Sequence, residues 1–210
     1  MQSGSMLACV VLTGVMLSLS ACSATSSSVD VLATTRVAID RDQYTLRRIG
    51  MLPVESAFLR ADEALAFQAA LATELSTRWR AEIVPLRGED VAETPAHQSF
   101  RTGRIDPDGI VTMARRYNLD GLVAVTVTDR RAYPPQRLGL EVELTACDTG
   151  LPIWAASLRL DASQERTRGA VHAWFDAARN ADSVPETWEL CLLSPLRFAE
   201  FAAAQVALAW

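Results

Sequence analysis

The chain contains no lysine: all 20 of its basic residues are arginine. This absence excludes a Walker A phosphate site, a Schiff base and a lysine general base. Histidine is almost as scarce, since only His97 and His172 occur, and neither belongs to an H-x-x-x-H or H-E-x-x-H pattern. C-x-x-C pairs, G-x-S-x-G elbows and glycine-rich phosphate loops are also missing. The sequence therefore predicts a protein that is not an enzyme and that holds neither a metal nor a cofactor.

Charge is absent from residues 1–21, where an apolar stretch is too short for a membrane helix of about 20 residues but typical of a secretory signal peptide. The stretch runs into Leu19-Ser20-Ala21-Cys22, which resembles the lipobox of bacterial lipoproteins. The resemblance implies cleavage before Cys22 and lipidation of its sulfur, and Ser23 behind it implies the outer membrane, with the domain facing the periplasm. The alternative is an ordinary cleaved signal with Cys22 as a plain thiol.

The segment behind the lipobox is rich in serine, which is typical of a flexible linker. We predict that residues 22–46 form the lipid anchor and tether, with a coil dimension of roughly 25 Å and an extended reach of about 75 Å. The net charge of −5 gives no sign of a nucleic-acid partner.

Two cysteines remain once Cys9 is removed with the signal peptide and Cys22 is lipidated. In an oxidising periplasm Cys147 and Cys191 could form a disulfide. The alternative is two unpaired, partly buried thiols. Two cysteines and distant histidines offer too few ligands for a metal site.

Hydrophobic periodicity predicts an α/β (α+β) domain over residues 47–163 and a helical extension, packed on the same domain, over residues 164–210. The expected order is strand, helix, strand, helix and then a three-strand meander, which indicates a three-layer-type mixed sheet with additional C-terminal helices. The strands are expected at 48–54, 81–86, 121–128, 138–147 and 153–160, and the helices at 61–79, 107–118, 164–180 and 195–210. The last helix could instead lie against a partner subunit.

Three strand and turn motifs carry a family resemblance. Ile49-Gly-Met-Leu-Pro-Val54, the run 114–128 and Asp148-Thr-Gly-Leu-Pro-Ile-Trp154 are similar to motifs of the N-terminal-TolB, CsgG and LpoB group of envelope lipoproteins. The resemblance covers residues 48–161 and implies a non-catalytic protein that binds other envelope proteins in assembly, secretion or peptidoglycan synthase regulation. The alternatives are a self-assembling or pore-associated homo-oligomer of CsgG-like domains and, more remotely, a cell-wall hydrolase. The membrane hairpins of CsgG and the long proline-rich tether of LpoB are missing.

The connection between the first two meander strands suggests a partner surface, because arginine and tyrosine are enriched at binding hot spots. It would consist of Arg130, Arg131, Tyr133 and Arg137. The alternative is an ordinary exposed connection. Glu141 and Glu143 are interpreted as the solvated face of a strand rather than as a catalytic pair.

Overall fold

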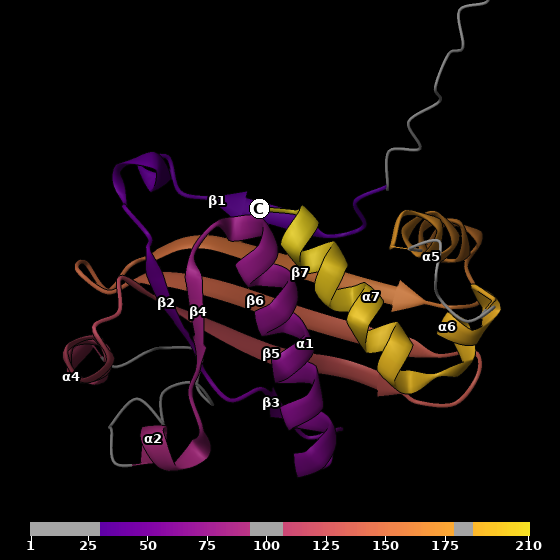
Figure 1. Cartoon of the computed structure of the whole chain (residues 1–210), viewed down its shortest axis with the longest axis horizontal. Helices are drawn as coiled ribbons and strands as arrows, with labels where there is room; N and C mark the ends of the chain where they lie inside the picture. The colour runs from indigo at the N-terminus through magenta and orange to yellow at the C-terminus, as the bar shows by residue number, and fades with distance from the viewer. Residues whose placement is uncertain (1–29, 93–106, 179–186) are drawn as a thin grey trace, which may run out of the picture.

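A mixed seven-stranded sheet organises the protein (Figure 1). The structure is a computed structural model that describes residues 30–92, 107–178 and 187–210. The signal peptide, the lipobox and His97 lie outside these residues. The strand order is β1-β7-β6-β5-β2-β4, with β3 also paired to β5, which confirms the predicted mixed α+β class.

The centre of the sheet is the predicted antiparallel meander of β5 (Gly121–Arg131), β6 (Arg137–Ala146) and β7 (Pro152–Asp161). Because side chains alternate along a strand, its apolar residues form buried rows across the three strands. The rows are Val127–Leu140–Leu158, Val125–Val142–Ala156 and Val123–Leu144–Trp154. The predicted turn between β6 and β7 contains Gly150 at φ 68°, a left-handed conformation that glycine adopts without strain.

Parallel strands extend the sheet beyond β5. β2 (Arg48–Met51) and the two-residue β3 (Glu55–Ser56) both pair with β5, and β4 (Glu82–Pro85) lies outside β2. Pro53 separates β2 from β3 because it has no N–H to donate to a ladder. The strand predicted over 48–54 therefore ends at Met51, and β3 follows just beyond the predicted range.

Two long helices lie side by side on one face of the sheet (Figure 1). α1 (Ala61–Trp79) has the predicted bounds, and α7 (Pro195–Leu208) begins where the Ser194 hydroxyl accepts a hydrogen bond from the Arg197 N–H at 3.4 Å. Both pack into the core formed by the meander, so the terminal helix covers its own sheet as expected. Their fully buried aromatic and leucine side chains are Leu71, Leu75, Phe198 and Phe201.

The opposite face is covered only in part. Leu122 belongs to a second cluster with Ile110 and Met113 of α4 (Pro107–Tyr117), and Gly50 stands opposite Leu122 in the sheet. A Cβ atom on Gly50 would lie 2.6 Å from Leu119 Cδ1, so glycine permits the close packing. The short α2 (Gly88–Ala92), where no helix was predicted, adds Val91 to this cluster. The sheet is therefore enclosed between helices at this end.

The N-terminal part of the described chain corrects the predicted tether. β1 (Thr34–Val37) pairs antiparallel with β7, and a 3-10 turn, η1 (Arg41–Gln43), follows. The prediction that residues 22–46 form a flexible tether is wrong from residue 30 onward. β1 was not predictable because its side chains are mostly exposed, so backbone pairing rather than an apolar pattern holds this edge strand.

Three tryptophans close the end of the core next to η1. The Trp79 and Trp210 rings stack with centroids 4.2 Å apart, and Trp154 meets both edge-on. The Arg41 guanidinium lies 3.7 Å from the Trp210 ring centroid. The end of α1, the start of β7 and the C-terminal residue are thereby packed together.

The remaining C-terminal helices are α5 (Glu165–Ala178), which was predicted, and the five-residue α6 (Glu189–Leu193), which was not. Ala170 and Val171 of α5 and Cys191 of α6 belong to the main core. Within the described part of the chain, every helix falls short of the length and apolar character that a membrane span requires.

If α7 is part of the core, Phe201→Ala should lower the free energy of unfolding by about 3–5 kcal/mol, because it opens a cavity at a fully buried position. Leu65→Ala on the exposed side of α1 is the matched control and should change stability by less than about 0.5 kcal/mol. Urea unfolding followed by tryptophan fluorescence measures both. Similar small effects at the two positions would show that α7 is not core.

Candidate partner surface

The connection between β5 and β6 is fixed in place by the side chain and backbone of Gln136. This residue is 1% exposed, and its Nε2 donates a 2.9 Å hydrogen bond to the Leu192 carbonyl at the end of α6. Its own carbonyl accepts from the Ala162 N–H just after β7, also at 2.9 Å. The connection is therefore attached to two other elements, and its exposed residues are presented from a rigid base.

Tyr133, the aromatic residue of this connection, is 68% exposed. The Arg131 guanidinium lies 5.0 Å from its ring centroid, within the range of a cation–π contact. Arg137 stands opposite Arg131 in the sheet, and its Nε is 3.8 Å from Asp129 Oδ2. One guanidinium, that of Arg131, therefore lies beside an exposed phenol ring, and the role of these residues as a partner surface stays a prediction.

Asp161 at the end of β7 balances part of this positive charge. Hydrogen bonds from the Ser163 hydroxyl and N–H, at 2.6 and 2.9 Å, hold the pKa of its carboxyl below the ordinary value. The charges of Arg137 and Arg131 act in the same direction. Asp161 is thus ionised at neutral pH.

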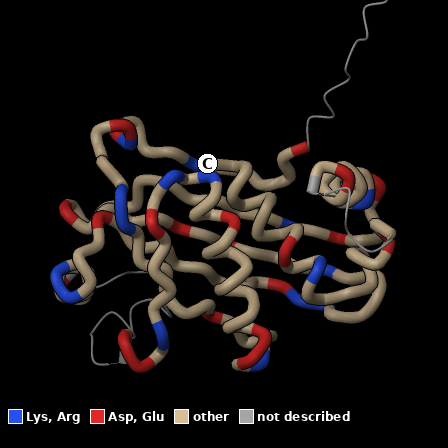
Figure 2. Tube along the Cα trace, in the orientation of Figure 1, with Lys and Arg blue, Asp and Glu red and all other residues tan. Residues whose placement is uncertain are grey.

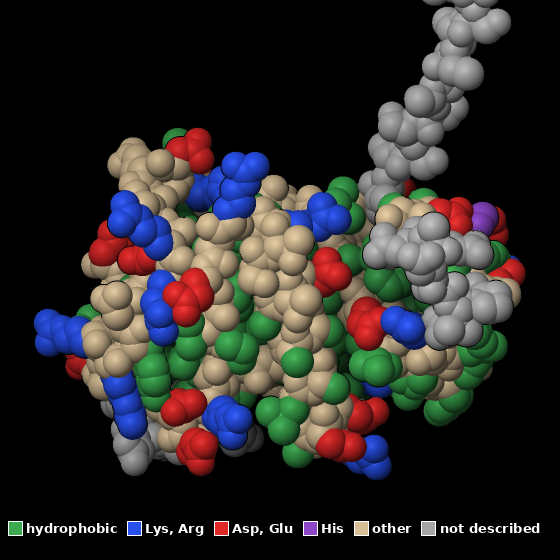
Figure 3. All heavy atoms as spheres, viewed as in Figure 1, with side chains coloured by type: hydrophobic (Ala, Val, Ile, Leu, Met, Phe, Trp, Pro, Cys, Tyr) green, Lys and Arg blue, Asp and Glu red, His purple; other side chains and the backbone are tan. Residues whose placement is uncertain are grey.

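Three exposed leucines lie next to the connection, because α6 is joined to it through Gln136. Leu190, Leu193 and Leu196 are 45%, 54% and 53% exposed and recur every three residues through α6 and the start of α7. Figure 3 shows hydrophobic side chains gathered at this end of the molecule. We call the set of Tyr133, Arg137, Leu190, Leu193 and Leu196 the end surface. These leucines were not predicted as part of a surface because α6 was not predicted.

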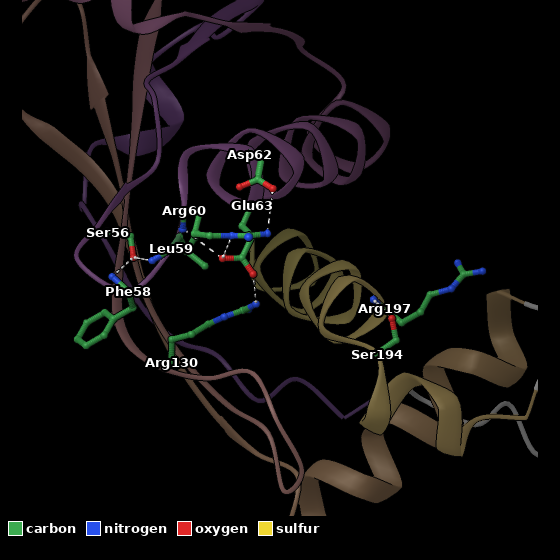
Figure 4. Close-up of polar contacts among 9 residues, drawn as sticks. All are labelled: Ser56, Phe58, Leu59, Arg60, Asp62, Glu63, Arg130, Ser194 and Arg197. Carbon is green, nitrogen blue, oxygen red and sulfur yellow. Dashed lines mark hydrogen bonds and ion pairs between the residues drawn. The ribbon is translucent and has the colours of Figure 1, made fainter.

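Arg130 does not belong to this surface, so that part of the prediction is wrong. A β-bulge between Val127 and Asp129 shifts the alternation of β5 by one residue and places Arg130 opposite the core residue Leu138. Its side chain is 9% exposed, and its Nη2 donates to Glu63 Oε1 at 3.4 Å (Figure 4).

Glu63 uses its other oxygen to accept the Arg60 N–H at 3.1 Å, which caps the first turn of α1. Figure 4 shows Arg130 reaching from β5 to this carboxylate. Arg130 therefore joins the end of β5 to the start of α1, and its function is structural.

Arginines and acidic residues are interspersed along the whole described trace (Figure 2). A stripe of one sign, which a nucleic-acid groove would need, is not seen in the described residues.

The two cysteines are not joined by a disulfide and lie far apart. Cys147 lies in the cluster under α4, whereas Cys191 lies in the main core, and the β6–β7 turn and α6 are at opposite ends of the sheet (Figure 1). The predicted disulfide is therefore wrong for the folded chain. Burial raises the pKa of the Cys147 thiol to about 12, and Asp120 and Asp148 contribute to the increase, so Cys147 is a poor nucleophile.

The other groups that could carry chemistry are scattered. No three His, Cys, Asp or Glu residues come together as metal ligands in the described part of the chain. His172 is exposed on α5 and contacts Asp176 at 3.4 Å and the Trp188 ring at 5.1 Å. Glu141 is exposed opposite Ser157, and burial raises the pKa of its half-buried neighbour Glu143. Both glutamates fit the interpretation of a strand face turned from the core.

No family model and no curated protein matches the sequence. Solved structures that align with the chain include the PelC dodecamer from Paraburkholderia phytofirmans, at 13% identity and a TM-score of 0.43, covering 66% of this chain and 89% of that one. Lipoprotein GNA1162 from Neisseria meningitidis aligns at 14% identity and a TM-score of 0.40, covering 65% and 99%. The LpoB C-terminal domain from Salmonella enterica aligns at 13% identity and a TM-score of 0.37, covering 57% and 87%. LpoB is a member of the group that the sequence motifs resemble.

The thiols of Cys147 and Cys191 should not react with a thiol reagent until the protein unfolds. In a Cys22→Ser variant, Cys147 and Cys191 should not react with an aromatic disulfide reagent at pH 8, because both are buried and the raised pKa leaves almost no Cys147 thiolate. Adding urea should release both thiols without a reductant. A disulfide would be revealed if reductant were needed, and an exposed thiol if colour developed under native conditions.

Arg130→Ala should destabilise the fold by about 1–3 kcal/mol, because it leaves Glu63 without its partner at the start of α1. Arg137→Ala, with a side chain 48% exposed, should change stability by less than about 0.5 kcal/mol. Urea unfolding compares the two. If the contact acts as described, Glu63→Gln should cost much less in the Arg130→Ala background than alone. If the two substitutions changed stability equally, the structural role assigned to Arg130 would be wrong.

Proposed function

We propose that this chain is a lipid-anchored accessory protein of the bacterial outer membrane that binds another envelope protein and performs no chemistry of its own. The observation that carries the proposal is the end surface, in which exposed apolar and arginine side chains are held by a buried hydrogen-bonded base. Its class of action would be assembly, secretion or the regulation of peptidoglycan synthesis.

The composition of the end surface supports protein binding. Tyrosine and arginine supply hot spots, and the leucines supply apolar area that a soluble monomer has no reason to gather in one place. The rigid base matters as well, because side chains that are already ordered lose little entropy when a partner binds. Gln136 is the residue that provides this preorganisation through its bonds to α6 and to the end of β7.

The lipobox supports the proposed location at the membrane. Lipidation of Cys22 would hold the domain at the membrane through several acyl chains, at about 0.8 kcal/mol for each buried methylene group. The scattered carboxylates, the exposed His172 and the high thiol pKa of Cys147 support a binding rather than a catalytic task.

Photocrosslinking in cells tests the proposal. With p-benzoylphenylalanine in place of Tyr133, we expect a discrete product that contains another envelope protein. The matched control carries the same group in place of Leu151, which is 57% exposed in the turn at the other end of the sheet and should give no product. Leu193→Glu should abolish the Tyr133 product, because it places a charge in the apolar part of the end surface.

Two results would overturn the proposal. One is the absence of any specific product at position 133 in cells where the protein is folded. The other is turnover of a cell-wall substrate by the purified chain. A Cys22→Ser variant tests the anchor separately and should move from the membrane to the soluble fraction.

A further inference from the structure

The length of chain between the lipid and the fold limits where the end surface can work. Eight residues lead from Cys22 to Asp30, the first residue that the structure describes. A chain of that length spans at most about 29 Å even when fully extended. A domain of this size is about 40 Å across. The whole domain is therefore kept within roughly 70 Å of the lipidated cysteine.

Contacts with α5 and α7 hold the segment that begins at Asp30 against the fold. The Asp30 carboxylate accepts hydrogen bonds from Arg166 Nε at 2.8 Å and Nη2 at 3.3 Å, and hydrogen bonding to Arg166 lowers the pKa of Asp30. This ion pair is exposed and adds little stability by itself. The Leu32 N–H makes the stronger attachment, because it donates at 2.8 Å to Oε1 of Gln205, which is fully buried in α7. The β1–β7 ladder then continues the attachment.

A chain of contacts places Asp30 and the end surface at the same end of the domain. Arg166, the partner of Asp30, lies in the first turn of α5. From the same helix, the Arg168 guanidinium lies 5.8 Å from the ring of Trp188, the residue before α6. α6 carries Leu190 and Leu193 and is joined to the Tyr133 connection through Gln136. Figure 1 likewise places the start of the described chain, α5 and α6 at one end.

We infer that the end surface binds a protein held in the same membrane as the lipid on Cys22, and not one that reaches out from the opposite membrane. The inference rests on the proposed function, since it assumes lipidation of Cys22. The anchor leaves from the end of the domain that carries the surface, so the short tether holds the surface within reach of the bilayer. The partner would offer apolar side chains to Leu193 and Leu196 and a carboxylate to Arg137 close to the membrane surface.

The test is to change the length of the tether and follow crosslinking from position 133. Thirty-two Gly and Ser residues inserted after Ser28 lengthen the link from 8 to 40 residues without touching the described fold. For a partner in the same membrane, the effective concentration should fall about tenfold, because it decreases roughly as the −3/2 power of linker length. The yield of the crosslinked product should fall accordingly in cells that express the full, lipidated chain.

The product should be a protein that fractionates with the same membrane. A yield that rises with the longer tether, or a product from the opposite membrane, would overturn the inference. A ladder of products that contain only this chain would overturn the inference and show that the end surface binds a second copy of the protein. A product with lipid would overturn it and show that the end surface binds the bilayer. Failure of the proposed function looks different: no product forms at either length, or Cys22→Ser leaves the yield of the short-tether protein unchanged.

Discussion

The period-two alternation of the meander is the constraint on which the rest of the structure depends. It places valines and leucines of β5, β6 and β7 in three rows on one face, and those rows have to be covered. α1 and α7 share this task, and α7 can lie close to both the sheet and α1 because most of its buried positions are alanine. The C-terminal helix is therefore no appendage. It covers the apolar face of the meander together with α1, and the Trp79–Trp154–Trp210 cluster packs at the end of that core.

Three buried glutamines join the irregular segments that this core cannot hold by apolar packing. Gln68 donates to the carbonyls of Met51, Leu52 and Leu86, where β2 and β4 end. Gln136 binds α6, and Gln205 accepts the Leu32 N–H beside β1. A buried polar side chain favours a hydrogen bond, and each of these makes one to a backbone group from a distant part of the chain. The places that matter most for binding, namely the Tyr133 connection and the entry of the tether, are the ones that two of these glutamines fix.

Patterns that arise from apolar side chains were predictable, and patterns that arise from backbone or from local irregularity were not. The bounds of α1 agree with the prediction because its apolar residues recur at helical spacing between an acidic first turn and Arg80. β1 was missed because its exposed side chains carry no periodicity. Arg130 was misplaced because one bulge in β5 reverses the faces behind it, and nothing in the run Thr128–Arg131 signals that bulge. Tyr133 and Arg137 were identified correctly as exposed, whereas the leucines of the end surface depended on a helix too short to predict.

The small edge strand β1 has an effect on function that exceeds its contribution to the core. Had residues 30–46 remained a linker, the domain could have moved about 75 Å from its anchor, far enough to seek partners well away from the bilayer. Pairing of Thr34–Val37 with β7, together with the Leu32 contact to Gln205, takes these residues out of the linker and reduces that reach to about 29 Å. In the proposed lipid-anchored protein, the same contacts select which end of the sheet the anchor leaves from. Because that end carries Tyr133, Leu193 and Leu196, the backbone pairing of four mostly exposed residues would then limit the range of the proposed binding surface.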